Sequence, residues 1–333
     1  MALPGKPTRS ASTEDSYRKR TSQLIARARK ELQISPHDAL DHRQFVGWLV
    51  TGKRNWSRST WRQNKASSAF SLEKEALNNP VAQEALDYLL SVDVDGCLPK
   101  GTRTSASKQK KFPLKDYRRL DLWLQDHRGT WNADVRQWLA CGLLTGLRPV
   151  EWAQAGMVTH LGEPALRVRN AKASNNRANG THRHIMLGGL SDEERDLIRT
   201  FVARANAWND AGQYQRFYQG CAATLARTCR LIWPKRDSYP TLYSARHQFS
   251  ADAKASGFSK EELAALMGHA ADATAGIHYG RKTAGFEMVR VRPDPGEVAL
   301  VRKVALGFGK RPEPKNTAKT TLSGPKQEPS ERK

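Results

Sequence analysis

Residues able to carry out phosphate chemistry are concentrated in one stretch of this 333-residue chain, residues 243–282. The stretch contains an arginine–histidine pair, a glycine–histidine pair and a tyrosine followed by basic residues: Arg246 and His247, Gly268 and His269, and Tyr279 before Arg281 and Lys282. Between the two histidine pairs, Leu263, Leu266 and Met267 have the spacing of one helical face. A helix at this position would fix the distance between the two pairs.

A tyrosine hydroxyl can attack a DNA phosphodiester if positive charge stabilises the equatorial oxygens and a proton donor assists the leaving group. Arginine suits the first task because its guanidinium group donates two hydrogen bonds to phosphate oxygens and stays charged. A lysine on a hairpin can protonate the departing hydroxyl. A histidine can hold or deprotonate the tyrosine, or donate to a non-bridging oxygen. This chemistry needs no metal, and the sequence contains no carboxylate cluster that would bind one, so we expect no cofactor.

An upstream arginine is suited to join this stretch. In the sequence LLTGLRPVEW, Gly146 is expected to end a helix over residues 132–144, so that Arg148 emerges just after the helix. Glu151 follows three residues later, a spacing suited to orienting the arginine. A purely structural pairing of these two side chains is the alternative interpretation.

A basic residue on a hairpin is also predicted. Two short segments of alternating character, 165–168 and 184–187, flank the polar, glycine-containing connection NAKASNNRANGTHR. They predict a β-hairpin with Lys172 at or near its tip. Lys172 as a solvated turn residue, with Arg169 or Arg177 in its place, is the alternative.

The charge of the chain indicates a polyanionic partner. There are 55 Lys and Arg against 33 Asp and Glu, which gives a formal net charge of +22 and a pI near 10.1. A ribosomal or membrane-surface protein would show the same balance. No apolar run approaches the roughly 20 residues that span a bilayer, and no apolar segment follows the basic N-terminus as in a secretory signal. We therefore expect a cytoplasmic protein that does not bind a membrane, with its four cysteines reduced.

The first hundred residues predict a small helical bundle. Residues 1–15 are rich in Pro, Gly, Ser and Thr, and we expect them to be disordered. Apolar residues then recur at helical spacing in four segments: 16–32, 42–49, 57–72 and 81–90. We expect residues 16–95 to form one helical domain that clamps DNA.

The segment GKRNWSRSTWRQNK, residues 52–65, interleaves two tryptophans with basic residues and hydroxyls. Such groups contact phosphates, and an aromatic ring can pack against sugar or base. Five basic residues of the segment are predicted DNA contacts: Lys53, Arg54, Arg58, Arg62 and Lys65. In the alternative, Trp56 and Trp61 are core residues and the charges only solvate a face.

A basic linker and a second domain follow. Residues 96–113 lack periodicity and predict a flexible linker whose Lys108, Lys110 and Lys111 follow a phosphate backbone. Helices and the hairpin are then expected within a mixed α+β domain over residues 114–308, with helices at 114–126, 132–144, 191–202, 213–233 and 298–306. Residues 309–333 predict a disordered basic tail. The expected fold class is therefore mainly α with a small β-hairpin or sheet.

The order of these motifs resembles that of the tyrosine recombinase (phage integrase) family: TGLRPVE, a hairpin lysine, ARH, GH and Y. The resemblance covers residues 111–303, and the helical first part looks like the core-binding domain of that family. Each motif alone is weak, whereas their order, spacing and polar context together are specific. The resemblance implies a core-binding domain, a mixed α+β catalytic domain, and a site-specific recombinase that works through a 3′-phosphotyrosyl intermediate without ATP or metal.

The resemblance assigns the phosphate clamp to Arg148 and Arg246, with Glu151 as the structural partner of the first. The second arginine of the family usually belongs to an HxxR motif, and here the histidine position is Tyr243. A tyrosine can donate a hydrogen bond to a phosphate oxygen, but with a pKa of about 10 it is a poor base near neutral pH. We expect activity to survive, with slower or differently balanced proton transfer, and we leave His247 out of the catalytic set.

The remaining roles fall to three residues. The resemblance implies that Lys172 is the general acid for the leaving 5′ hydroxyl, that His269 supports the phosphate and the nucleophile, and that Tyr279 is the nucleophile. Arg281 is a further predicted DNA contact. Tyr279 follows His269 by ten positions where the family usually has nine, which an extra residue in the turn AADATAG would explain. In the alternative reading, His269 is a core histidine.

The same resemblance implies double-stranded DNA as partner, a homo-tetramer on paired DNA sites, an accessory DNA-bending or directionality factor, a nucleoid-associated location, and service to a mobile element. Two other functions stay open. A type IB topoisomerase shares the arginines, lysine and tyrosine but relaxes supercoils without site choice. A decayed relative would only bind DNA, which the departure at Tyr243 and the spacing to Tyr279 would support.

Overall fold

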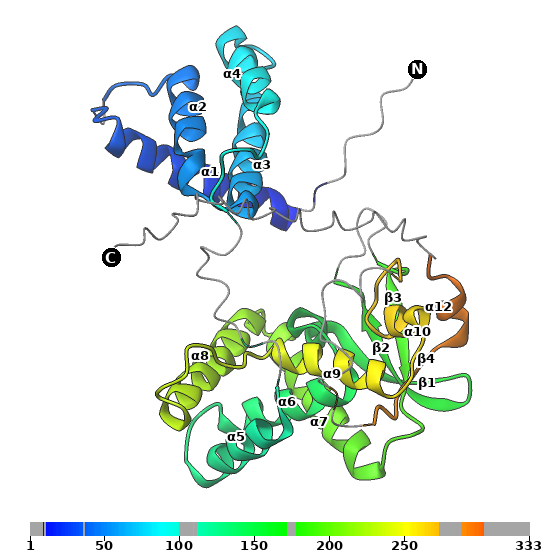
Figure 1. Cartoon of the computed structure of the whole chain (residues 1–333). Helices are drawn as coiled ribbons and strands as arrows, with labels where there is room; N and C mark the ends of the chain where they lie inside the picture. Colours follow the sequence, from blue (N-terminus) through cyan, green and yellow to red (C-terminus); the bar gives the residue numbers. More distant parts are fainter. Residues whose placement is uncertain are drawn as a thin grey trace, which may run out of the picture. The chain divides into compact units, whose positions relative to one another are not determined.

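A computed structural model of the chain describes residues 9, 11–35, 37–99, 109, 112–171, 178–272, 285 and 288–302. Within these residues the chain is mainly helical and contains one small antiparallel sheet (Figure 1). The fold class predicted from the sequence is confirmed.

Four α-helices lie in the first part of the described chain: α1 (Ala11–Glu31), α2 (His42–Thr51), α3 (Arg58–Glu75) and α4 (Pro80–Ser91), with a 3-10 helix, η1 (Gly52–Asn55), after α2. Helices α1 and α4 pack against α3, and α2 packs against α4. Their shared core includes Leu24, Leu49, Trp61, Leu72 and Leu89. Three of the helices begin at a side chain that accepts hydrogen bonds from the first turn: Asp41, Ser57 and Asn79.

Helix α1 begins earlier than the sequence predicts. Residues 11–15 are predicted to be disordered, but they form the first turn of the helix, so this part of the prediction is wrong. Ion pairs four residues apart, Glu14–Arg18 at 3.0 Å and Asp15–Lys19 at 2.9 Å, stabilise these turns. The acidic side chains also lie near the positive end of the helix dipole.

The second part of the described chain combines further helices with the sheet: α5 (Leu114–Asp126), α6 (Asn132–Thr145), η3 (Pro149–Gln154), α7 (Asp192–Asp210), α8 (Tyr214–Ile232), α9 (Ser244–Ala255), α10 (Lys260–Leu266) and α12 (Pro295–Ala299). Helix α6 contacts α5, α7, α8 and α9 (Figure 1). The core around it includes Trp138, Trp152, Phe201, Phe217 and Phe249. Helices α6 and α9 are therefore held together, and they carry two of the motifs identified in the sequence.

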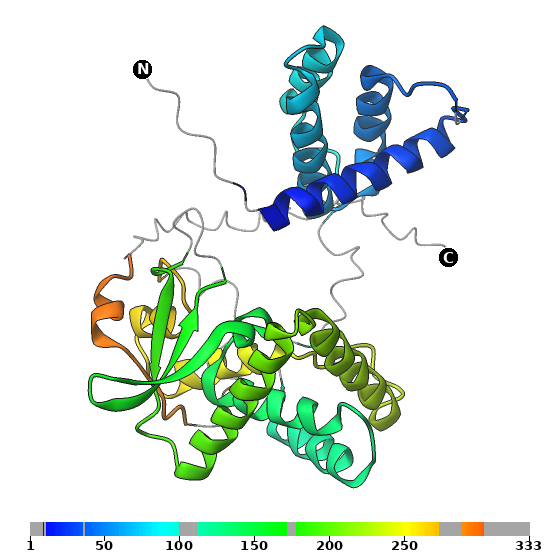
Figure 2. The same cartoon turned by 180° about the vertical axis from the view of Figure 1, so that it is seen from behind.

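The sheet has the strand order β1-β2-β3-β4, with antiparallel neighbours: β1 (Ala155–His160), β2 (Glu163–Arg169), β3 (His182–Met186) and β4 (Arg292–Pro293). Figure 2 shows the longer strands from behind. The predicted hairpin corresponds to β2 and β3, where Val168 pairs with Arg183. Strands β1 and β4 were not predicted from the sequence. Strand β1 has no alternating burial, and β4 is two residues long and exists through its pairing with β3.

The chain after β4 also differs from the prediction. A helix is expected at 298–306, but the described helix is α12, which Asp294 caps and Pro295 begins. Val301 packs against Ala264 and Ala265 of α10. The backbone N–H of Arg302 donates to the carbonyl of Ala270 at 3.0 Å, so this segment pairs with another part of the chain and does not continue the helix.

No helix within the described ranges has the length and apolar character needed to cross a membrane. The thiols of Cys97, Cys141, Cys221 and Cys229 are free, as expected. Burial raises the pKa of the Cys229 thiol to about 12, which keeps it protonated and unreactive near neutral pH.

Candidate active site

Glu151 is the centre of a buried cluster of arginine side chains. It belongs to η3, and Arg148 lies directly before that helix with extended backbone. The backbone N–H of Arg148 donates to Glu151 Oε2 at 2.8 Å, and Arg148 Nη1 donates to Glu151 Oε1 at 2.5 Å. Both residues are buried, with 6% and 2% of their surface exposed. The carboxylate thus orients Arg148, as the spacing predicts.

Arg246 joins the cluster from α9 and is completely buried. Its Nη1 donates to the carbonyl of Gly146 at 2.6 Å and lies 3.7 Å from Glu151 Oε2. Its Nη2 donates to the carbonyl of Met267 at 2.6 Å. The guanidinium group therefore connects the turn before Arg148 to the turn before His269.

A third arginine, Arg183 of β3, completes the cluster and was not among the predicted site residues. Only 1% of its surface is exposed. Its Nη2 donates to Glu151 Oε2 at 2.8 Å, its Nε donates to the carbonyl of Leu266 at 2.8 Å, and its Nη1 donates to Asn170 Oδ1 at 2.6 Å. A buried arginine with a full set of hydrogen-bond partners is a costly feature that a packing role alone does not require.

His269 lies next to Arg246 and is 3% exposed. Its Nε2 is 3.4 Å from Arg246 Nη2. Because a guanidinium group only donates, Nε2 acts as the acceptor and the ring proton is on Nδ1. Burial, and after it the charges of Arg246, Arg148 and Arg183, lower the pKa of His269 from its ordinary value to about 2. The imidazole is therefore neutral near pH 7.

The electrostatics of the cluster favour an anionic group. Burial raises the pKa of the Glu151 carboxyl, but Arg183, Arg246 and Arg148 outweigh it, so this pKa lies far below its ordinary value. Glu151 is therefore ionised throughout the neutral range. Among the described residues, three guanidinium groups surround this one carboxylate, and the field at His269 is positive.

Two glycines allow the backbone segments of the site to approach closely. Gly146 ends α6 with a φ of 67°, and a Cβ there would lie 2.2 Å from Phe249 Cδ1. Gly268 precedes His269 with a φ of 62°, and a Cβ there would lie 2.4 Å from Asn170 Oδ1 and 2.7 Å from Arg183 Nη1. The glycines of the TGLR and GH motifs are therefore needed for both conformation and space.

Tyr243 lies directly before α9, three residues before Arg246. Its ring packs against His247 with a centroid separation of 5.1 Å and an interplanar angle of 66°. His247, which we left out of the catalytic set, therefore contacts the side chain of Tyr243. A catalytic role for Tyr243 stays a prediction.

Six predicted site residues lie outside the described residues: Lys108, Lys110, Lys111, Lys172, Tyr279 and Arg281. The proposed nucleophile and general acid are among them. The described part of the candidate site therefore consists of the arginine–histidine cluster and its supports.

The predicted DNA contacts of the first part divide into two kinds. Arg54, Arg58 and Arg62 are exposed. Lys65 Nζ instead donates to the carbonyls of Leu90 at 2.8 Å and Val92 at 2.6 Å, at the end of α4. Such a lysine satisfies backbone groups that the helix end leaves without partners.

Lys53 and the two tryptophans of the same segment also make contacts within the chain. Lys53 Nζ lies 3.7 Å from Asp93 Oδ1 and 5.8 Å from the ring centre of Trp61. Trp56 and Trp61 are buried and stack with ring centres 6.4 Å apart. The alternative that both tryptophans are core residues is confirmed.

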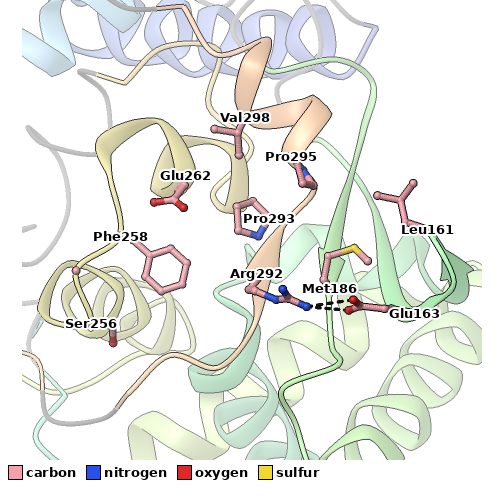
Figure 3. A pocket seen from close by; sticks show the side chains of 11 residues that line it. Leu161, Glu163, Met186, Ser256, Phe258, Glu262, Arg292, Pro293, Pro295 and Val298 are labelled. Atoms are coloured by element: carbon pink, nitrogen blue, oxygen red, sulfur yellow. Dashed lines mark hydrogen bonds and ion pairs between the residues drawn. The ribbon is translucent and has the colours of Figure 1, made fainter.

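A separate cavity of about 540 Å³ lies beside β4 and α12 (Figure 3). Phe258, Pro293 and Val298 contribute apolar walls, and Arg292 pairs with Glu163 at 3.0 Å in the lining. No member of the arginine cluster lines this cavity, so it is distinct from the candidate active site. Within the described ranges, no group of three or more His, Cys, Asp or Glu side chains is arranged to hold a metal ion.

No protein-family model matches the sequence, and no curated protein matches it. Solved structures do match. The Tn1549 transposon integrase in complex with a circular intermediate DNA is 13% identical over 81% of this chain and 95% of its own, with a TM-score of 0.44. The XerH site-specific recombinase bound to a palindromic difH substrate is 12% identical over 81% and 76%, with a TM-score of 0.46. A lambda integrase dimer bound to a COC′ core site is 13% identical over 84% and 93%, with a TM-score of 0.44. These proteins are tyrosine recombinases and integrases, the family that the motifs of the sequence resemble.

Proposed function

We propose that this chain is a tyrosine-type site-specific DNA recombinase that cleaves and rejoins DNA through a 3′-phosphotyrosyl intermediate. The observation that carries the proposal is the convergence of Arg148, Arg246 and His269 on one buried, positively charged site around Glu151. A phosphodiester suits this site because guanidinium groups donate to its non-bridging oxygens. Donors held in place before the reaction stabilise the charge that develops on those oxygens in the transition state.

In the proposed reaction, Tyr279, Lys172 and His269 each have one role. The phenol oxygen of Tyr279 attacks the phosphorus, and the bond from phosphorus to the 5′ oxygen breaks. Lys172 gives a proton to the departing 5′ oxygen, and the proton of the tyrosine passes to water. The neutral imidazole of His269 supports the phosphate and the nucleophile, with its ring proton on Nδ1 as the available donor. Rejoining reverses these transfers with a new 5′ hydroxyl. The phosphotyrosyl bond retains the energy of the broken bond, so the step needs no ATP.

The rest of the chain would bring DNA to this site. The net charge of +22 favours a polyanion, and the exposed Arg54, Arg58 and Arg62 are candidate phosphate contacts. We further propose that four more basic residues contact the DNA: Lys108, Lys110, Lys111 and Arg281. We further propose that the protein works as a homo-tetramer on paired DNA sites and that an accessory DNA-bending or directionality factor assists it. The proposed reaction would serve a mobile element.

Trapping of a covalent adduct tests the proposal. Wild type and Tyr279→Phe would be incubated with DNA of the element that carries the gene, denatured, and freed of unattached DNA. We expect DNA attached to the wild type alone, mapping to one short site. Adducts spread over all sequences would indicate a type IB topoisomerase. Tight DNA binding with no adduct from either protein would indicate a relative that only binds DNA. Both of these outcomes contradict the proposal.

A further inference from the structure

Asn170 closes the base of the turn between β2 and β3. Its backbone N–H donates to the carbonyl of Thr181 at 2.8 Å. Its side-chain Nδ2 donates across the turn to the carbonyls of Asn179 at 2.9 Å and Gly180 at 3.1 Å. One side chain thus holds the two ends of the turn together.

The same asparagine is connected to the arginine cluster. Arg183 Nη1 donates to Asn170 Oδ1 at 2.6 Å, while the other nitrogens of this arginine donate to Glu151 and to the carbonyl of Leu266. The next residue along the chain, Ala171, donates from its backbone N–H to Glu151 Oε1 at 3.4 Å. The base of the turn is therefore bound to the carboxylate that orients Arg148.

The base of the turn is also in close contact with the residue before His269. A Cβ at Gly268 would overlap Asn170 and Arg183. On its other side, the turn is attached to α12, because Asn179 Nδ2 donates to the carbonyl of Glu297 at 2.6 Å. Buried polar networks of this kind, with every member bonded, hold a single geometry.

We propose that Arg183 and Asn170 form a positioning pair that holds the base of the β2–β3 turn against the phosphate clamp, and so places the proton donor of the turn for the leaving 5′ oxygen. This inference rests on the proposed function, in which Lys172 follows Ala171 in the sequence. Both members of the pair act through other residues.

A substrate whose leaving group needs no proton tests the pair. In a 5′-bridging phosphorothiolate, sulfur replaces the 5′ oxygen at the scissile bond. Tyrosine attack then releases a 5′ thiolate, which leaves without a proton donor because a thiol is far more acidic than an alcohol. Rates of covalent adduct formation would be measured on the mapped site with oxygen and with sulfur at this position.

We expect Asn170→Ala to cleave the oxygen substrate about 10²-fold more slowly than wild type, because a small displacement of a catalytic group costs a factor of this order. On the sulfur substrate we expect a rate within about threefold of wild type. Arg183→Lys keeps one charge but not the fork that joins Asn170, Leu266 and Glu151, so it should show the same pattern. If Arg183→Lys fails to fold, Asn170→Ala decides alone.

Asn206→Ala is the matched control. Its amide also donates one side-chain hydrogen bond to a backbone carbonyl, that of Ala155 at 3.0 Å, but it lies on α7 and contacts no member of the cluster in the described structure. It should cleave both substrates like wild type. Equal slowing of Asn170→Ala on both substrates would overturn the inference, because the pair would then support the clamp and not the proton donor. A wild-type rate on both substrates would overturn it as well.

Failure of the proposed function would be distinguishable. If the wild type forms no adduct with either substrate, the proposed function is wrong. If the wild type cleaves both substrates and Lys172→Ala is not slowed on the oxygen substrate, Lys172 is not the proton donor. In that case the pair does not act through Lys172, and the inference is wrong while the function stands.

Discussion

The side chain of Arg246 donates to the carbonyl oxygen of Gly146 at 2.6 Å, although the two residues are 100 positions apart in the chain. Gly146 ends the helix that precedes Arg148, so this bond joins the two arginine-bearing motifs directly. The second guanidinium nitrogen donates to Met267, two residues before His269. One side chain thus joins the three motif segments, although they lie far apart in the sequence.

Gly146→Ala should destabilise the protein by roughly 2–4 kcal/mol, since the alanine would have a φ of 67° and a Cβ in contact with Phe249. Gly162→Ala is a matched control, because Gly162 has a φ of 77° and open space around a Cβ. We expect Gly162→Ala to lower the free energy of unfolding by only about 1 kcal/mol, the cost of the positive φ alone. Denaturant unfolding of both variants measures the difference, and equal losses would contradict the predicted clash with Phe249.

Glu151→Gln should be among the most destabilising substitutions, with a loss of about 3–5 kcal/mol, because it leaves the buried guanidinium groups without their carboxylate. Glu163→Gln is the control, since its pair with Arg292 is exposed and should contribute less than about 1 kcal/mol. Thermal and denaturant unfolding would show the contrast. A small effect of Glu151→Gln would mean that the cluster does not depend on this carboxylate.

The depressed pKa of His269 predicts a loss of stability in acid. The unfolded chain takes up the histidine proton as the pH falls below about 6.5, whereas the folded protein, with a pKa of about 2, does not. Stability should therefore fall with decreasing pH, by at most about 1.4 kcal/mol per unit from this group. The free energy of unfolding of wild type and His269→Gln would be compared between pH 6.5 and 5, and we expect a shallower slope in the variant. Identical slopes would show that His269 titrates normally.

Lys65 and Arg62 belong to the same helix but should respond differently. Lys65→Ala removes two hydrogen bonds to carbonyls at the end of α4 and should cost about 1–2 kcal/mol of stability. Arg62→Ala, at an exposed position, should leave the free energy of unfolding unchanged within about 0.5 kcal/mol. It should lower DNA affinity, and the slope of log affinity against log salt concentration should become shallower by about one. Unfolding curves and salt-dependent DNA binding measure both. The reverse pattern would show that Lys65 contacts DNA and that Arg62 supports the fold.

Local sequence signals were sufficient to predict most of the described helices. The range predicted for α5 agrees with the structure, and α7 begins at the Ser191 cap with its reciprocal Glu194 contact. The ion pair of Arg148 with Glu151 also follows from a spacing of three residues in the sequence. These features depend on neighbours along the chain, which a single sequence contains.

The features that were missed depend on distant partners. Strand β4 exists because it pairs with β3, and nothing in its two residues indicates a strand. Arg183 occupies an inward position of β3 between residues of ordinary strand character, and its role is set by Glu151, Asn170 and Leu266. The predicted segment began at residue 184, so Arg183 was placed in the polar connection before it, where a basic residue gives no signal of a buried role. Lys65 was assigned to DNA because its carbonyl partners follow 25 and 27 residues later.

The central claim is that Arg246 clamps the negative charge of the scissile phosphate, and a charge-neutral substrate tests it most directly. In a methylphosphonate, a methyl group replaces one charged non-bridging oxygen, so the clamp has less charge to stabilise. Adduct formation by wild type and Arg246→Ala would be measured on the mapped site with either linkage. We predict that Arg246→Ala loses at least about 10²-fold of its rate on the phosphodiester and recovers most of that loss on the methylphosphonate. An equal loss on both linkages would show that Arg246 only supports the fold and would contradict the account.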